Sequence, residues 1–212
     1  MRSLSDIKEY WNDVQRQDHL GALSGCQFQD TIYFLGLSGW IKKDQKILEV
    51  GVGLGYVTRE LYEAGVNVSA LDISDKALTR VSKYCQNLYL VENIDSLPSN
   101  YFDFIICHNT IQHIPTHILD QELYHIIRSL KSTGILALQF ISSQLDQDTG
   151  SDEYLKKDNT HDQNIGCYCR SPGFLEKMIN KHGGKCQLIF GCETQITDII
   201  NGSYVFHIRR AV

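Results

Sequence analysis

Short apolar runs alternate along this chain with segments in which apolar residues recur every three or four positions. The runs predict buried strands, because a strand covered on both faces shows no polar alternation. The strands are expected at 47–50, 66–71, 88–91, 102–107, 135–141, 187–192 and 204–208. The three-and-four spacing predicts helices. These are expected at 7–14, 28–40, 55–64, 75–85 and 116–130, with a last helix beginning at 171–172.

The alternation of strands and helices predicts an α/β fold, a doubly wound and mostly parallel sheet with helices on both faces. With 212 residues, the chain has the length of a single domain, 1–212. One segment breaks the pattern. Residues 142–170 are rich in Asp, Ser, Asn and Gln and are too long for an ordinary connection, so we expect a substrate loop there.

The composition of the chain limits the kinds of partner that we expect it to bind. The net charge of −5 argues against a nucleic-acid partner, which usually requires a basic surface. No apolar run reaches the length of a membrane span, and the first residues lack the apolar core of a signal peptide. Seven cysteines occur without a Cys-x-x-Cys pair, and Cys167, Cys169 and His161 match no zinc spacing. We therefore expect a cytoplasmic protein with reduced thiols, no metal and no membrane partner; its oligomeric state stays open.

Three glycines follow the first strand at single-residue intervals: Gly51, Gly53 and Gly55. A strand, a glycine-rich turn and a helix N-terminus form a cradle for a ligand, because backbone without Cβ atoms approaches it closely. The spacing lacks the Gly-Lys-Ser/Thr of a phosphate-binding loop and does not fit the Gly-x-Gly-x-x-Gly of dinucleotide sites. We call residues 51–55 the glycine turn.

Further motifs follow in order. Asp72 ends the second strand about 20 residues after Gly51, the position of an acid that binds ribose hydroxyls. With Glu49–Gly55, Ala70–Ser74, Asn93–Pro98 and Phe102–Ile106, the chain resembles the class I S-adenosylmethionine (SAM)-dependent methyltransferases over roughly residues 44–140. The resemblance implies a seven-stranded sheet whose last strand is antiparallel. It also implies SAM as cofactor and S-adenosyl-L-homocysteine as product.

The resemblance places a cofactor site at the carboxyl ends of the strands. Its implied members are Glu49, Gly51, Val52, Gly53, Gly55, Asp72, Ile73, Asn93, Ile94 and His108. In this resemblance, Glu49 binds the ammonium group of SAM and Asp72 binds its ribose. Asn93 stands where the family usually has an aspartate that binds the adenine. The alternative role for Asp72 is to cap the next helix together with Ser74.

Two histidines precede Ile114-Pro115, in residues 108–115, which we call the histidine turn. A hydroxyl acceptor must lose a proton near the transition state, and histidine suits that task. His113 is the first candidate for the catalytic base and His108 the second. The alternative is structural: the pair caps the next helix or hydrogen-bonds to the sheet. Tyr10 and Trp11 are expected in an N-terminal helical lid, about residues 1–40, although Trp11 could instead anchor its helix to the core.

The expected function is SAM-dependent methyl transfer to a small-molecule or sugar-type acceptor, with an oxygen acceptor slightly favoured. The alternatives are a protein, peptide or N-methyltransferase and a non-catalytic SAM-binding subunit. A dinucleotide-dependent oxidoreductase is disfavoured by the glycine spacing. The residues after the strand expected at 102–107 lack Asn/Asp-Pro-Pro-Tyr, the motif of nucleic-acid amino methyltransferases. They also lack the acidic residues that a magnesium-dependent methyltransferase needs.

Overall fold

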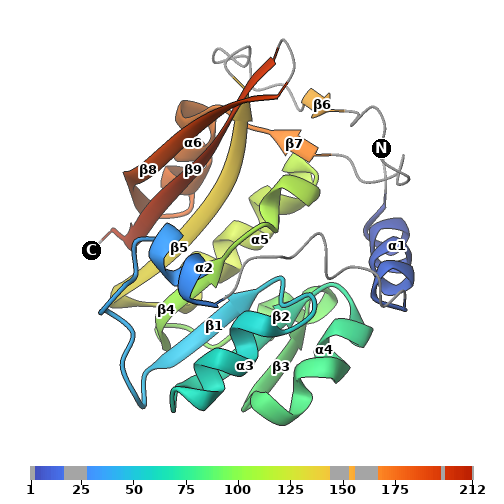
Figure 1. Cartoon of the computed structure of the whole chain (residues 1–212), viewed down its shortest axis with the longest axis vertical. Helices are drawn as coiled ribbons and strands as arrows, with labels where there is room; N and C mark the ends of the chain where they lie inside the picture. The colour runs from blue at the N-terminus through green and yellow to red at the C-terminus, as the bar shows by residue number, and fades with distance from the viewer. Residues whose placement is uncertain (1–2, 17–27, 144–152, 156–166, 197–198, 212) are drawn as a thin grey trace.

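A seven-stranded sheet forms the centre of the molecule in the computed structural model, which describes residues 3–16, 28–143, 153–155, 167–196 and 199–211 (Figure 1). Its order is β3-β2-β1-β4-β5-β9-β8. The strands are β1 (Lys46–Val50), β2 (Asn67–Asp72), β3 (Asn87–Leu90), β4 (Phe102–Cys107), β5 (Leu130–Ser143), β8 (Gly184–Ile196) and β9 (Ile199–Arg210). All pairings are parallel except those of β9, so the predicted sheet with an antiparallel last strand is confirmed.

The strands at the carboxyl end of the chain are longer than the pattern predicted. β8 and β9 pair from Gly184–Arg210 to Ile196–Ile199, far beyond the expected 187–192 and 204–208. Polar residues such as Thr194 and Gln195 belong to this hairpin, and their strand conformation comes from the ladder of hydrogen bonds. A second, two-stranded sheet joins β6 (Glu153–Leu155) to β7 (Cys167–Cys169). Both strands lie inside the segment that we expected to be a loop, whose remaining parts largely lie outside the described residues.

The α-helices are α1 (Leu4–Arg16), α2 (Phe28–Phe34), α3 (Tyr56–Glu63), α4 (Asp75–Val81), α5 (Thr116–Ser129) and α6 (Pro172–Lys181). The helix expected over 28–40 was predicted too long, because Gly36 and Gly39 adopt positive φ angles of 67° and 76°. The helix expected over 75–85 changes to a short 3₁₀ helix, η2 (Ser82–Tyr84). Two further 3₁₀ helices are η3 (Val91–Ser96) and η4 (Ile111–His113).

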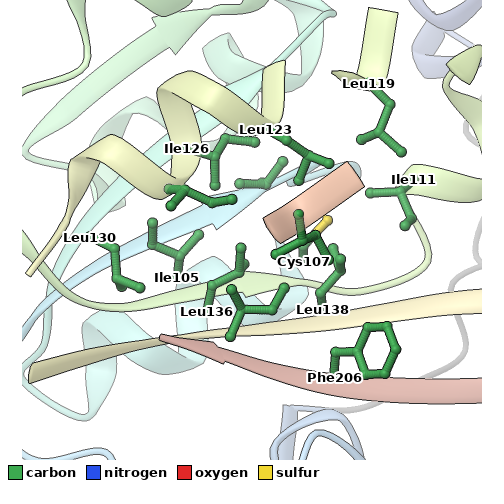
Figure 2. Close-up of a cluster of buried hydrophobic side chains, with 14 of the residues drawn as sticks. Ile105, Cys107, Ile111, Leu119, Leu123, Ile126, Leu130, Leu136, Leu138 and Phe206 are labelled. Carbon is green, nitrogen blue, oxygen red and sulfur yellow. The ribbon is translucent and has the colours of Figure 1, made fainter. Parts of the chain in front are cut away.

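Apolar side chains cover both faces of the sheet, as the doubly wound prediction requires. On one face, Leu123 and Ile126 of α5 pack with Ile105 and Leu136 of the sheet (Figure 2). On the other face, Leu61 of α3 belongs to a second buried cluster. The helices therefore fix the positions of β1, β2 and β4, whose carboxyl ends form one edge.

Candidate functional site

The carboxyl ends of β1, β2 and β4 are neighbours in the sheet. Val50 is paired with Leu71 on one side and with Cys107 on the other. The residues that follow these strands therefore meet at one edge, which brings together the glycine turn, Asp72 and the histidine turn. We call this edge the candidate site.

The three glycines of the turn have positive φ angles, but their surroundings differ. A Cβ on Gly51 would lie 2.2 Å from Oγ1 of Thr110, and one on Gly55 would lie 2.4 Å from Cγ1 of Val81. A Cβ on Gly53 would meet nothing within 4 Å. Gly51 and Gly55 thus permit close internal packing, whereas Gly53 faces open space. The backbone at Gly53 is therefore open to close approach by a ligand.

Thr110 joins the glycine turn to the histidine turn. Its hydroxyl oxygen lies 3.1 Å from the carbonyl oxygen of Val50 and 2.9 Å from that of His108. The sequence reasoning missed Thr110, because a lone threonine in a turn has no distinctive pattern. The side chain of Thr110 can lie this close to residue 51 only because Gly51 has no Cβ.

Asp72 is buried at the end of β2, and both of its oxygens accept hydrogen bonds from the backbone. Oδ2 accepts from the N–H of Gly53 at 3.3 Å, and Oδ1 accepts from the N–H of Ser74 at 2.8 Å. Burial raises the pKa of Asp72, and these hydrogen bonds oppose the rise. The helix cap is Ser74 itself, whose Oγ accepts from the N–H of Ala77. Asp72 therefore supports the start of the helix indirectly while it holds the glycine turn.

Glu49, the next-to-last residue of β1, carries a second buried carboxyl group. The hydroxyl of Thr58 donates to its Oε2 at 2.5 Å. Burial, with a smaller effect of the neighbouring Asp72, raises the pKa of Glu49 to about 8, and the hydrogen bond from Thr58 opposes the rise. Within the described residues, no salt bridge reaches Glu49 or Asp72. Two buried carboxyl groups without a cation, beside an open glycine, fit a ligand with a cationic part and hydroxyl groups.

The third motif lies on η3 at the same edge. Asn93 is exposed and has non-helical backbone angles, φ −115° and ψ 28°. Ile94 is half-buried against the core, and its carbonyl accepts a hydrogen bond from the N–H of Leu97. Ile73, after β2, is also half-buried. The side chain of Asn93 is therefore accessible to solvent.

His108 follows β4 and is largely buried. Its ring centroid lies 5.7 Å from that of Phe34, and burial lowers its pKa to about 4. The next residue, Asn109, has a positive φ of 53°. Its N–H donates to Oε1 of the buried Gln139 at 2.8 Å, which holds this backbone in place. Gln139 was not predicted as a site residue, although a polar side chain in the apolar run 135–141 was a usable signal.

His113 lies on η4, where its ring packs against Trp11 of α1. The two ring centroids are 5.2 Å apart at 64°. The N-cap residue of α5 is Pro115, which makes no side-chain cap hydrogen bond. The structure thus joins two predicted site residues that are about a hundred positions apart in the sequence.

The N-terminal helix α1 lies across the edge, beside α4 (Figure 1). The hydroxyl of Ser74 donates to Oδ1 of Asn12 at 2.6 Å, and Lys8 forms a 3.1 Å salt bridge with Glu92 of η3. Tyr10 packs edge-on against Trp11, with centroids 5.4 Å apart. The helix begins at Leu4, three residues earlier than expected, and the side-chain oxygen of Ser3 accepts a hydrogen bond from the N–H of Asp6. With the Trp11 contact, α1 touches elements on both sides of the candidate site.

Two negative findings apply to the described part of the chain. None of its helices is long and apolar enough to cross a membrane. No group of three or more His, Cys, Asp or Glu side chains is arranged there to hold a metal ion.

Sequence comparison matches residues 48–138 to a family described as a methyltransferase domain. A "Ubiquinone biosynthesis O-methyltransferase" from Rickettsia canadensis is 28% identical over 103 residues, which are 46% of this chain and 43% of that protein. The protein of that name from Rickettsia akari is 27% identical over 103 residues, 46% of this chain and 40% of that protein. The chain thus matches less than half the length of these relatives.

Structure comparison extends the likeness to nearly the whole chain. Phosphoethanolamine N-methyltransferase 2 from Haemonchus contortus, solved with phosphomonomethylethanolamine and S-adenosylhomocysteine, has a TM-score of 0.67 at 15% identity. The likeness covers 97% of this chain and 60% of that one. Magnesium protoporphyrin IX methyltransferase from Synechocystis PCC 6803, with bound S-adenosylhomocysteine, has a TM-score of 0.65 at 16% identity and covers 97% and 99%. Residues 48–138 thus match a methyltransferase domain, and nearly the whole chain shares the fold of these two methyltransferase structures.

Proposed function

We propose that this protein is an enzyme that transfers the methyl group of SAM to a small-molecule or sugar-type acceptor, with an oxygen acceptor favoured. One observation carries the proposal. The open Gly53, the buried Asp72 and Glu49, and the two histidines meet at a single edge of the sheet. When bound there, SAM supplies an activated methyl group on a sulfonium ion.

The residues of the cradle bind and orient the cofactor in this proposal. Asp72 accepts hydrogen bonds from the ribose hydroxyls, because its carboxylate offers two acceptor oxygens at the end of β2. Glu49 faces the ammonium group, directly or through water. The backbone at Gly51, Val52, Gly53 and Gly55 surrounds the amino-acid part. Ile73, Asn93 and Ile94 receive the adenine. His108 borders the cofactor at the end of β4.

The two histidines differ as candidate bases. A His108 with a pKa of about 4 is neutral at physiological pH and a weak base, so it orients a group or donates a hydrogen bond. His113 is half-buried next to Trp11 and is the proposed base for an acceptor hydroxyl. Alignment of the acceptor with the methyl group supplies much of the rate enhancement, and the base adds to it.

The proposed acceptor side lies between the histidine turn and α1. Tyr10 and Trp11 belong to a helical lid formed by about the first 40 residues, of which α1 and α2 are described. The loop expected to complete the acceptor site, residues 142–170, mostly lies outside the described residues. The Rickettsia relatives are named O-methyltransferases, which supports a hydroxyl acceptor.

Nitrogen acceptors are the second candidate, since one structural neighbour is named an N-methyltransferase. An amine that arrives uncharged needs no base, so N-methylation would proceed without His113. We further propose a cytoplasmic location, which the free thiols of Cys85, Cys107 and Cys186 support.

The first experiment is calorimetry of SAM and S-adenosyl-L-homocysteine on ligand-stripped protein. Micromolar binding of both, with 1:1 stoichiometry, supports the proposal. Radiolabelled SAM is then used with two panels of acceptors, matched in shape, that carry hydroxyl or amino groups. A folded protein that binds neither ligand would overturn the proposed function. Transfer to amines alone would replace the oxygen assignment.

A further inference from the structure

Arg170 is a buried cation whose side chain is directed at one short stretch of backbone. It is 1% exposed. Nη1 donates to the carbonyl oxygen of Ile111 at 3.0 Å, and Nη2 donates to that of Ile114. Nε donates to the hydroxyl oxygen of Thr116 at 3.2 Å. These three acceptors bracket His113 on both sides in the sequence.

The geometry requires a guanidinium group. Burying a charged group is costly unless its N–H groups find acceptors, and here the acceptors belong to a single turn. The donors of arginine diverge in a rigid plane, so one side chain reaches Ile111, Ile114 and Thr116 together. Lysine carries the same charge on a compact head that cannot span these acceptors. The hydrogen bonds of Arg170 therefore fix the backbone shape of η4, which a positive charge alone would not do.

Arg170 also connects this turn to the sheet. Its own N–H donates to the carbonyl oxygen of Ile141 in β5 at 3.0 Å. It directly follows β7, and its guanidinium carbon lies 5.4 Å from the ring centroid of Tyr168. The histidine turn is thus attached to β5 through Arg170, about 55 residues further along the sequence.

We propose that Arg170 is a positioning residue that holds His113 against Trp11 at the edge of the candidate site. The proposed role of Arg170 has two parts. The first part is that Arg170 fixes the histidine turn, and it rests on the hydrogen bonds described above. The second part is that a fixed histidine turn matters for methyl transfer, and it rests on the proposed function of His113.

The first part has a readout that needs neither cofactor nor acceptor. A protonated imidazole in contact with an indole quenches its fluorescence. In a Trp40→Phe background, Trp11 is the sole tryptophan, and its emission as a function of pH reports the His113 contact. Trp40 must be replaced because it lies 5.8 Å from His207.

Arg170→Lys and Thr116→Val are then compared in this background. Thr116→Val removes one acceptor and keeps the arginine, so it serves if Arg170→Lys does not fold. We expect the pH-dependent quenching to shrink by half or more in Arg170→Lys and by less in Thr116→Val. The matched control is Arg210→Lys, because Arg210 donates to a carbonyl oxygen, that of Leu130, away from the histidine turn. It should titrate like the background protein.

The second part is tested by kinetics with SAM. We expect Arg170→Lys to lower kcat about tenfold or more while the Kd for SAM stays within about twofold, because acceptor alignment is lost and the cradle is intact. Quenching that is unchanged in both variants overturns the positioning role. Changed quenching with unchanged kcat overturns its catalytic part. If the parent protein transfers no methyl group, the proposed function fails, and the fluorescence result on Arg170 still stands.

Discussion

The carboxylate of Asp72 accepts a 3.3 Å hydrogen bond from the backbone N–H of Gly53, the one glycine of the turn that faces open space. The contact joins the end of β2 to the turn after β1. A change at either residue therefore affects both the shape of the cradle and its affinity for a ligand. The relationship suggests paired variants that separate these two effects.

Asp72→Asn should weaken SAM binding by about 10- to 100-fold, because a charged acceptor is replaced by a neutral one with a single carbonyl oxygen. Calorimetry measures the change. Asp75→Asn is the matched control, since Asp75 is an exposed acid three residues later at the start of α4. Equal affinities for the two variants would contradict the assignment of Asp72.

Gly53→Ala and Gly51→Ala should fail in different ways. A Cβ at position 53 enters open space, so we expect a folded protein, a stability loss of about 1 kcal/mol from the positive φ, and markedly weaker SAM binding. A Cβ at position 51 would collide with Thr110, so the loss of stability should be larger. Thermal melting and calorimetry check both outcomes. Normal affinity in a folded Gly53→Ala protein would place the ligand elsewhere.

Glu49 should release a proton when SAM binds. Its pKa is about 8 in the free protein, so it is mostly protonated at pH 7, and an adjacent ammonium group lowers that pKa. Calorimetry at pH 7 in buffers of different ionisation enthalpy measures the released protons. We expect up to one proton for the natural chain and close to none for Glu49→Gln. Equal release by both would assign the proton to another group.

His113→Asn should lower the rate with a hydroxyl acceptor by about 100-fold or more and leave SAM affinity unchanged. The natural enzyme should lose activity at low pH as the base becomes protonated, and this acid limb should disappear in the variant. His108→Asn should keep the acid limb, because a group with a pKa of about 4 is already neutral above pH 5. Initial rates across the pH range test both. An acid limb that survives in His113→Asn would remove His113 as the base.

Glu122 should make the protein less stable at alkaline pH. It lies on α5 beside a small apolar cavity lined by Cys107, Leu119 and Leu138, and burial raises its pKa to about 8. The folded state holds a proton that the unfolded state has lost above pH 4.5. The stabilisation is therefore full below that pH and is lost as the pH rises through 8.

Glu122→Gln should remove this term, which is on the order of 3 kcal/mol between pH 5 and 8. Denaturant unfolding at the two pH values measures it. The residual slope should come largely from Glu49, whose pKa is raised in the same direction. Glu9→Gln on α1 is an exposed control. An unchanged slope in Glu122→Gln would mean that Glu122 ionises normally.

The local sequence determined the central strands, the glycine turn and the carboxyl groups of Glu49 and Asp72 near the ends of β1 and β2. These features depend on short-range chemistry: an apolar run is buried, glycine allows positive φ, and an acid at a strand end lies at the sheet edge. Residues 47–50 and Asp72 were therefore placed correctly from the sequence alone. The order of the motifs likewise anticipated the match of residues 48–138 to a methyltransferase domain.

Only the tertiary structure decided the contacts that complete the site. Trp11 and His113, or Arg170 and Ile111, are too far apart in the sequence for any spacing rule to relate them, and a buried arginine after a polar segment gives no local signal. The same holds for the long β8–β9 hairpin, where pairing overrides the weak strand preference of Asn201 and Gly202. Local preferences are encoded residue by residue, whereas these contacts exist only after the sheet brings its strand ends to one edge.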